Sequence, residues 1–389
     1  MNNVVSDNIN YARDLIISKP VEDFVNKSDI SGMYAGGFFG WFRSFESYTG
    51  GKGWVTSSFK IRNSINEGNI GSLLDTTGYV LGGIVGTLYS SYDDYQLSAL
   101  DRNLITNVVN RGNIYGSRKA YQMGGIVGQN KYSWLLIDGV ENYGSIENQN
   151  ANYVYVGGIL GYGNGIDSVV NSANYGNINL RGDDDNEADV VVGGIVSESP
   201  KTDVIRCANY GDIHVAKIYA AFIAGVAENV ETVTYCVNKG RIEANVEDTR
   251  NGRVAGIAFS AETVKGCMNK GNLILGATGA GSVLYPIYGG QTKRAGNFSA
   301  ADTVMVNGKM VLGIVEDSCS YIDKSKLGLD SDSGVFARTS TEMQSDEFAW
   351  NLNTCYGKYK NSEMWSYRDS GYPVVADSFN APIYRIGFW

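Results

Sequence analysis

The chain has few of the residues from which most metal sites and catalytic triads are built. Its 389 residues include one histidine, His214, and five cysteines, none of them in a CxxC pair. A site that needs two imidazoles is therefore excluded, a zinc knuckle has no support, and a Ser-His-Asp triad has only His214 to use. We predict no metal site, no cofactor and no catalytic residue.

Positive charge and long hydrophobic runs are also scarce. The formal net charge is −9, with 32 Lys and Arg against 41 Asp and Glu. A protein that reads a nucleic-acid backbone needs a basic surface, so this charge argues against nucleic acid and against docking on anionic lipid. No run of 18 apolar residues occurs, so we predict no membrane insertion.

Proline is rare, with 5 residues, whereas glycine is abundant, with 49. The glycines do not follow the Gly-X-Y period of collagen. Hydrophobic residues make up 43% of the chain and charged residues 19%, which is typical of a folded protein. Tyrosine, with 26 residues, is twice as frequent as phenylalanine, with 13, which favours a β-rich protein with partly exposed aromatic side chains.

A short phrase anchored on asparagine recurs along the chain. The seven anchors are Asn66, Asn110, Asn142, Asn174, Asn209, Asn238 and Asn269. Each anchor is followed by a glycine two residues later and by an aliphatic residue four residues later, and a small or apolar residue stands two positions before it. Three copies read CANYGDI, YCVNKGRI and GCMNKGNL. Because a catalytic motif is normally used once, this repetition indicates architecture.

A second phrase runs in step with the first. Its copies are AGGFFG, LGGIVG, MGGIVG, VGGILG, VGGIVS and the weaker IAGVAE and VAGIAF. Residues around it alternate, as in YVYVGGIL, where Val154 and Val156 share one face and Tyr153 and Tyr155 share the other. We expect the glycine pairs to make tight corners at positive φ, and the asparagine and glycine of the first phrase to adopt left-handed turn conformations.

A unit of about 31 residues with short strands cannot bury its own hydrophobic face, but stacked units can. Equivalent residues then lie about 4.8 Å apart, and a column of asparagines can hydrogen-bond along the stack. Helical repeats fail because no 3.6-residue apolar stripe fits between the glycines. We therefore predict an all-β protein: a parallel β-solenoid (β-helix) of about seven coils with N- and C-terminal capping segments.

The chain divides into three predicted segments. Residues 1–30 form an N-terminal cap or an incomplete first coil: residues 9–16 resemble a degraded copy of the asparagine phrase, whereas residues 18–23 carry helix-start signals. Residues 31–275 form the solenoid. The period then fades, so residues 276–389 are predicted to form an atypical last coil and a C-terminal cap.

Both phrases resemble the GLUG repeat of bacterial surface proteins, in which a GGIVG strand is followed by an N-[CS]-x-N-x-G-x-[IV] phrase. The likeness is clearest at Met123–Gly128 and Arg206–Ile213, and it extends to Thr339–Asn353 and Met364–Val375, which are similar to segments that commonly close such arrays. The resemblance implies a large secreted or wall-attached protein. Similar repeats occur in the non-catalytic N-terminal part of some IgA-cleaving metallopeptidases, although the HExxH signature is missing from this chain.

The residue between the asparagine and the glycine of the first phrase varies and should face outward. It is Glu67, Arg111, Tyr143, Tyr175, Tyr210, Lys239 and Lys270 in successive copies. We predict that Tyr143, Tyr175 and Tyr210 form a stacked, exposed ladder, which makes them the candidate ligand-binding residues because sugar rings stack on aromatic faces. The structural alternative is that tyrosines in register stabilise one another, by about 0.5–1.5 kcal/mol per pair.

The cysteines allow two interpretations. Cys207, Cys236 and Cys267 occupy one column of three successive copies, and we expect free, buried thiols that pack as small hydrophobes. A disulfide between adjacent coils is the alternative, because the expected Cα spacing permits it. In an extracellular protein Cys319 and Cys355 could pair.

The acidic run between Asp183 and Asp189 lacks the spacing of an EF-hand, so we expect a solvated loop rather than a calcium site. The tripeptide Arg181-Gly182-Asp183 matches the sequence that integrins recognise, but tripeptides of this kind arise often by chance.

These observations favour a non-catalytic bacterial surface or secreted module, either an adhesin or a scaffold, that presents a rigid face to a glycan or a host protein. It would be extracellular or located at the bacterial cell surface. One alternative is a carbohydrate-active β-helix enzyme of the polysaccharide lyase or hydrolase type. Another is a structural spacer whose partners are other domains of a larger parent chain.

Overall fold

The structure is a computed structural model of the chain. It describes residues 21–44, 46–49, 53–56, 60–74, 78–90, 102–182, 189–246, 252–277, 282–289, 293–313, 320–328, 337–354, 365–366 and 371–375. The predicted features at residues 9–16 and 183–188, as well as Cys319 and Cys355, lie outside these ranges.

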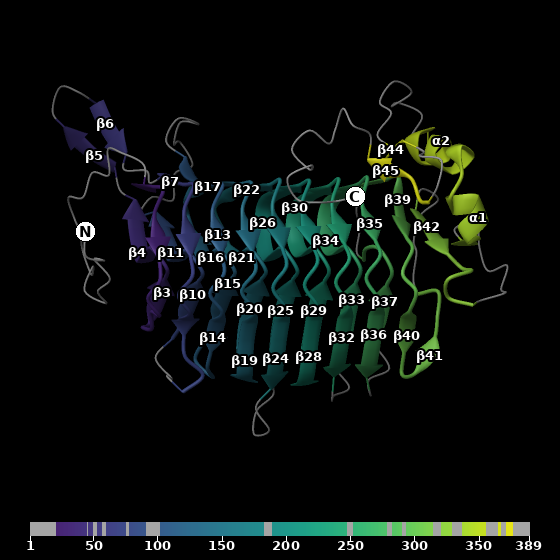
Figure 1. Cartoon of the computed structure of the whole chain (residues 1–389), viewed down its shortest axis with the longest axis horizontal. Helices are drawn as coiled ribbons and strands as arrows, with labels where there is room; N and C mark the ends of the chain where they lie inside the picture. Colours follow the sequence, from purple (N-terminus) through teal and green to yellow (C-terminus); the bar gives the residue numbers. More distant parts are fainter. Residues whose placement is uncertain are drawn as a thin grey trace.

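The protein is a β-solenoid, as the sequence predicts, with strands stacked along one long axis (Figure 1). Four sheets run the length of the stack, and nearly all their strand pairs are parallel. The solenoid makes about six turns, slightly fewer than the seven coils predicted.

Two of the sheets form one side of each coil. The 13-stranded sheet contains β1 (Val21–Glu22), β4 (Phe39–Ser44), β7 (Lys60–Arg62), β11 (Val85–Ser90), β12 (Asn103–Thr106), β16 (Val127–Lys131), β17 (Trp134–Asp138), β21 (Leu160–Gly163), β22 (Ile166–Val170), β26 (Val196–Ile205), β30 (Ala227–Thr234), β34 (Ala258–Lys265) and β38 (Lys293–Ala295). The 11-stranded sheet contains β2 (Val25–Asn26), β8 (Ile65–Asn66), β13 (Val109–Asn110), β18 (Glu141–Asn142), β23 (Ala173–Asn174), β27 (Ala208–Asn209), β31 (Val237–Asn238), β35 (Met268–Asn269), β39 (Asn297–Ser299), β42 (Ser320–Asp323) and β43 (Ala337–Arg338).

The other two sheets complete the coil. The 9-stranded sheet contains β9 (Ile70–Gly71), β14 (Ile114–Gly116), β19 (Ile146–Ala151), β24 (Ile178–Gly182), β28 (Ile213–Ile218), β32 (Ile242–Val246), β36 (Leu273–Ala277), β40 (Val304–Val306) and β41 (Lys309–Met310). The 8-stranded sheet contains β3 (Tyr34–Gly36), β10 (Val80–Gly82), β15 (Gln122–Gly124), β20 (Tyr153–Gly157), β25 (Asp189–Gly193), β29 (Ala220–Ala224), β33 (Gly252–Ala255) and β37 (Val283–Tyr285). Two antiparallel hairpins, β5 (Glu46–Thr49) with β6 (Gly53–Thr56) and β44 (Trp365–Ser366) with β45 (Val374–Val375), stand apart.

One coil visits the sheets in a fixed order. The chain passes from the 11-stranded sheet (β13) to the 9-stranded sheet (β14) and the 8-stranded sheet (β15), and then twice through the 13-stranded sheet (β16 and β17) before β18 starts the next coil. From β26 onward a single long strand replaces the two, because β26 pairs with both β21 and β22.

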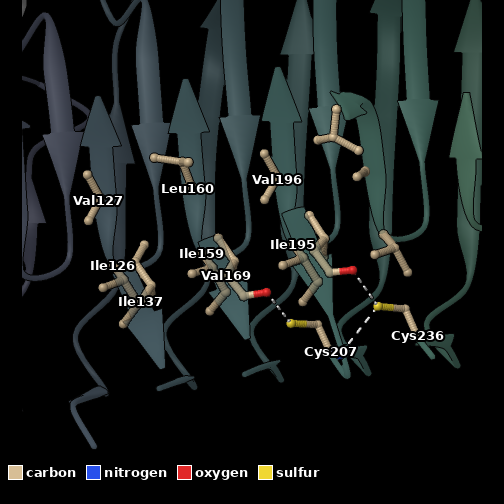
Figure 2. Packing of buried hydrophobic residues seen from close by; sticks show 14 of the residues in the cluster. Ile126, Val127, Ile137, Ile159, Leu160, Val169, Ile195, Val196, Cys207 and Cys236 are labelled. Carbon is tan, nitrogen blue, oxygen red and sulfur yellow. Dashed lines mark hydrogen bonds between the residues drawn. The ribbon is translucent and has the colours of Figure 1, made fainter. Parts of the chain in front are cut away.

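The interior contains two long hydrophobic columns. One packs along the 13-stranded sheet and includes Ile126, Ile159 and Ile195 from the second phrase (Figure 2). The other lies between the 8- and 9-stranded sheets and contains the aliphatic column of the first phrase, such as Ile146 and Ile178. The predicted aliphatic column of the first phrase is therefore stacked inside the coil, and so is the column two positions before the anchor, which includes Val140 and Cys207.

The predicted turn conformations are wrong in position. Neither the anchor asparagines nor the glycine pairs have positive φ. The left-handed residue stands three positions before the anchor, with φ between 47° and 64°, at Asp23, Asn63, Asn107, Gly139, Asn171, Arg206, Tyr235, Gly266 and Gly296. The glycines of both phrases serve close packing instead of backbone rotation.

The described part of the N-terminal segment belongs to the stack. Strands β1 and β2 pair with β7 and β8, so Val21–Glu22 and Val25–Asn26 are extended on either side of the left-handed Asp23. Asn26 aligns with Asn66, which reveals a copy of the phrase that the sequence reading missed. This copy has Ser28 at the position of the usual glycine, so it does not match the phrase in the sequence.

The other end of the described chain departs from the coil pattern. Helices α1 (Ser340–Met343) and α2 (Asp346–Thr354) pack a small hydrophobic cluster onto the last coils (Figure 1). Trp365 is buried in this cluster, and its indole N–H donates to the Gly296 carbonyl over 2.8 Å. A capping box between Thr339 and Glu342 fixes the start of α1.

Candidate functional site: the tyrosine ladder

A buried column of asparagines holds the corner on which the tyrosines stand. The side-chain NH2 group of each anchor donates a hydrogen bond to the side-chain oxygen of the anchor in the next coil. These bonds are 2.7–2.9 Å long and link the asparagines one after another from Asn26 to Asn269. In every coil from Asn66 onward, the same NH2 group donates a second hydrogen bond, 2.8–3.1 Å long, to the carbonyl oxygen of the glycine two residues later. The column therefore fixes both the turn and the spacing between coils.

The glycine of the phrase is required by contact between neighbouring coils. A Cβ atom added at Gly144 would lie 1.9 Å from the carbonyl oxygen of Gly112, and one at Gly176 would lie 1.9 Å from that of Gly144. No side chain fits such a gap. Ser28 stands at this position in the first coil that the structure describes.

With the asparagine and the glycine turned inward, the residue between them faces outward. The rings of Tyr143 and Tyr175 are 4.6 Å apart and 5° from parallel, and those of Tyr175 and Tyr210 are 4.8 Å apart and 4° from parallel. The three predicted site residues therefore lie together as a stacked ladder. Tyr143 is 46% exposed, and the other two are partly buried.

Charged residues border the ladder at both ends. The Lys239 ammonium lies 5.0 Å from the ring centre of Tyr210 and covers its outer face. At the other end, Glu141 accepts a hydrogen bond from the Tyr143 hydroxyl over 3.1 Å. Arg111, one coil further, forms an ion pair with Glu67 over 3.7 Å.

Burial shifts the pKa values of the ladder tyrosines and of the neighbouring Lys239. It raises the pKa of Tyr143, for which Glu141 adds a smaller effect, and raises the pKa of Tyr175. It raises the pKa of Tyr210 to about 12. Desolvation lowers the pKa of Lys239. At neutral pH the ladder therefore presents three neutral phenols.

The stacking geometry limits what the ladder can contact. Parallel rings less than 5 Å apart cover each other's faces. What remains for a ligand is the outer face of Tyr143 and the row of ring edges and hydroxyl groups. Such a row can donate and accept hydrogen bonds, but a sugar ring cannot insert between the tyrosines.

The three column cysteines are free and buried, as expected. The Cys207 thiol donates to the Val169 carbonyl over 3.3 Å, and the Cys207 amide donates to the Cys236 sulfur over 3.3 Å (Figure 2). Burial raises the pKa of Cys236 and Cys267. The thiols thus replace the hydroxyls of Ser64 and Ser172, which occupy the same column in earlier coils.

A buried polar cluster was missed by sequence reasoning. Asp167 lies inside the 13-stranded sheet, where Asn130, Ser199 and Thr202 donate hydrogen bonds to its carboxylate. Burial nevertheless raises the pKa of Asp167 to about 7. An aspartate at an inward position of a strand is the signal that could have revealed this cluster. The sequence alone does not show which residues of this strand face inward, because the preceding bend interrupts the alternation.

Few other features suggest a site. Among the described residues, no cluster of His, Cys, Asp and Glu is arranged to hold a metal ion. A surface pocket near the N-terminal end is lined by Asp29, Asn69, Leu74 and Tyr115 among others, and it contains none of the predicted site residues.

Comparison with models of known families, with curated proteins and with solved structures found no match. The likeness to GLUG repeats therefore remains a prediction from the two phrases. Within the described ranges, no helix is long and apolar enough to span a membrane.

Proposed function

We propose that the protein is a non-catalytic adhesion or scaffold module of a bacterial surface or secreted protein, and that it presents a rigid solenoid face to a glycan or host-protein ligand. The observation that supports this proposal is the tyrosine ladder. Its three rings are held parallel, one coil apart, on a corner fixed by the asparagine column. The resemblance to GLUG repeats supports the extracellular or cell-surface location.

The rigidity of the corner favours binding. A surface whose groups are already ordered loses little conformational entropy when a ligand arrives. The tyrosine hydroxyls repeat with the coil spacing, so they match a ligand that is itself extended and repetitive. Lys239 adds a cation at one end of the row.

The alternative of a carbohydrate-active enzyme requires groups that exchange protons near neutral pH. The ladder supplies phenols whose pKa is raised, which makes them poor acids and bases under those conditions. A pure spacer differs from both in having no ligand for this face.

A glycan and matrix-protein array tests the proposal. Three proteins are compared: wild type, a triple Tyr143/Tyr175/Tyr210→Ala variant and a triple Tyr→Phe variant at the same positions. We expect wild-type binding, loss in the alanine variant, and weakened binding in the phenylalanine variant, which keeps the stack but lacks the hydroxyls. Circular dichroism confirms that each variant is folded.

If a folded alanine variant retains full binding, the ladder is not the site. If wild type binds nothing, the spacer alternative is favoured.

A further inference from the structure

A pocket of about 480 Å³ opens on the outer surface of the first three described coils. Its size falls within the range that is typical of ligand sites. Asp29 and Ser31 line it from the first coil, Asn69, Leu73 and Leu74 from the second, and Tyr115 from the third. The pocket therefore lies at the N-terminal end of the stack, and none of the ladder tyrosines lines it.

The column of outward side chains has a gap at this pocket. Gly71 pairs in register with Tyr115, and the same column continues in later coils with Glu147, Asn179 and His214. A Cβ atom added at Gly71 would lie 2.3 Å from the Tyr115 carbonyl oxygen, and φ is 75° there, so the position requires glycine. The missing side chain leaves space beside the Tyr115 ring, which stacks on no other ring among the described residues.

The rim of the pocket is apolar. The side chain of Leu74 is 94% exposed and that of Leu73 is 40% exposed. Seven of the ten large hydrophobic residues that are exposed in the described chain lie between Phe24 and Tyr79, in the first two coils. At the opposite end of the stack, helices α1 and α2 cover the last coils with a hydrophobic cluster. Exposed apolar surface that is concentrated at one end indicates contact with another molecule.

Asp29 is the single charged residue among the described residues that line the pocket. Its carboxylate accepts one hydrogen bond, from the Asn69 backbone N–H over 2.7 Å, and no described residue forms an ion pair with it. The Tyr115 hydroxyl accepts a hydrogen bond from the Asn113 side chain over 3.0 Å. The pocket therefore presents one unbalanced negative charge beside an aromatic ring and two leucines, which favours a ligand that carries a positive charge.

We propose that this pocket binds a lysine or arginine side chain from an extended, partly apolar segment of a partner protein. The aliphatic stem of such a side chain packs on Leu73 and Leu74, and its charged head pairs with Asp29 and lies against the Tyr115 ring. A sugar fits less well, because its hydroxyl groups would lose hydrogen bonds to water against the two leucines. The pocket spans three coils, or about 10 Å, which matches about three residues of an extended chain.

This inference rests on the proposed function in that the ligand is an external protein, but it places that ligand outside the ladder. Fluorescence anisotropy on the full chain tests it with three labelled peptides. The peptide LRLRL carries both features, LELEL reverses the charge, and SRSRS keeps the charge without the apolar residues. We expect LRLRL to bind at least about tenfold more tightly than the other two, and to bind more weakly as NaCl is raised from about 0.05 to 0.5 M.

Three variants locate the site. Asp29→Asn removes the charge but keeps an acceptor for the Asn69 N–H, and it should weaken LRLRL binding about tenfold. Leu74→Ser should weaken binding about three- to tenfold without changing the melting temperature, because this side chain is already exposed. Asp212→Asn is the matched control and should bind like wild type. Asp212 stands three residues after its anchor, as Asp29 does, and accepts the same kind of hydrogen bond, from the Arg241 N–H over 2.8 Å.

The inference is wrong if LRLRL fails to bind, if it binds no more tightly than LELEL, or if Asp29→Asn and wild type bind it equally. Sedimentation velocity of the chain alone checks whether a second copy occupies the pocket. A wild-type dimer that the Asp29→Asn substitution dissociates would overturn the assignment to a partner protein.

The outcomes separate this inference from the proposed function. If the triple Tyr→Ala variant of the ladder loses LRLRL binding, the peptide binds at the ladder and the inference fails alone. If no peptide binds but the array identifies a ladder-dependent ligand, the inference again fails alone. If LRLRL binds at the pocket while the array is negative, the inference stands and the ladder is not a binding site.

Discussion

Removing one member of the asparagine column should destabilise the protein far more than its size suggests. The Asn174 side chain takes part in three buried hydrogen bonds: it accepts one from Asn142 over 2.8 Å, and donates one to the Gly176 carbonyl and one to Asn209, each over 2.9 Å. Asn174→Ala leaves these three partner groups short of one hydrogen bond each in a buried site. At about 1–3 kcal/mol for each of the three groups, the free energy of unfolding should fall by about 3–9 kcal/mol.

Asn177 provides the matched control, since it lies three residues away in the same coil. It is exposed, and its side chain accepts one hydrogen bond, from the Asp212 amide over 2.9 Å. Asn177→Ala should therefore lower the free energy of unfolding by only about 0.5–1.5 kcal/mol.

Urea unfolding followed by circular dichroism measures both changes. A repeat array can unfold in more than one step, so the midpoint and slope of each transition are compared with wild type. Equal shifts in the two variants would refute the reasoning, because they would mean that the buried column contributes no more than a surface hydrogen bond.

Three further predictions concern the interior. Asp167 has a folded-state pKa near 7, above its ordinary value of 3.8, so the folded state binds this proton more tightly; its stabilising effect is complete below pH 3.8 and is lost as the pH rises through 7. The free energy of unfolding of wild type should therefore fall by about 2–3 kcal/mol between pH 5 and 8, and that of Asp167→Asn should fall by less. Urea titrations at several pH values measure both, and identical pH profiles for the two proteins would contradict the prediction. Gly176→Ala should lower the unfolding free energy by about 3 kcal/mol or prevent folding, because its Cβ would lie 1.9 Å from a carbonyl oxygen, and a normal melting curve would be inconsistent with that contact. The thiols of Cys207, Cys236 and Cys267 should not react with Ellman's reagent until the protein is unfolded, and rapid labelling of these three in the native protein would show that the column is accessible.

The stacked columns could be predicted from the sequence because their spacing relative to one anchor never changes. Asparagine, glycine and isoleucine recur at offsets of zero, two and four, and each offset corresponds to one physical constraint: a side-chain hydrogen bond, a coil-to-coil contact or a buried stack. The ladder of Tyr143, Tyr175 and Tyr210 follows directly, because it lies between two inward-facing positions.

The outward residues on either side of the second phrase could not be found in the same way. The segment between the first and second phrases varies in length, so outward positions beyond it fall out of step with the asparagine anchors. They return to register only when counted from the glycine pair, across a bend in which two successive residues, such as Gly86 and Thr87, face outward. Strict alternation of faces therefore fails at the bend.

The left-handed turn was misplaced for a related reason. Seven of its nine positions carry Asn, Asp or Gly, which tolerate positive φ, but Arg206 and Tyr235 interrupt the column. The asparagine and glycine of the first phrase keep a constant spacing from copy to copy, so the turn was predicted at those residues, three or more positions after the actual left-handed residue.

The stacking of one coil on the next is the central claim, and distances between spin labels test it most directly. In a protein whose native cysteines are replaced by serine, one label is placed at Tyr115 and the second at His214, Glu243 or Ile274, which the register puts three, four and five coils away. Pulsed electron–electron resonance should give distances near 14, 19 and 24 Å, rising by about 4.8 Å for each coil although about 30 residues are added each time. Distances that are broad, or that do not rise by one strand spacing per repeat, would contradict the solenoid and every site derived from it.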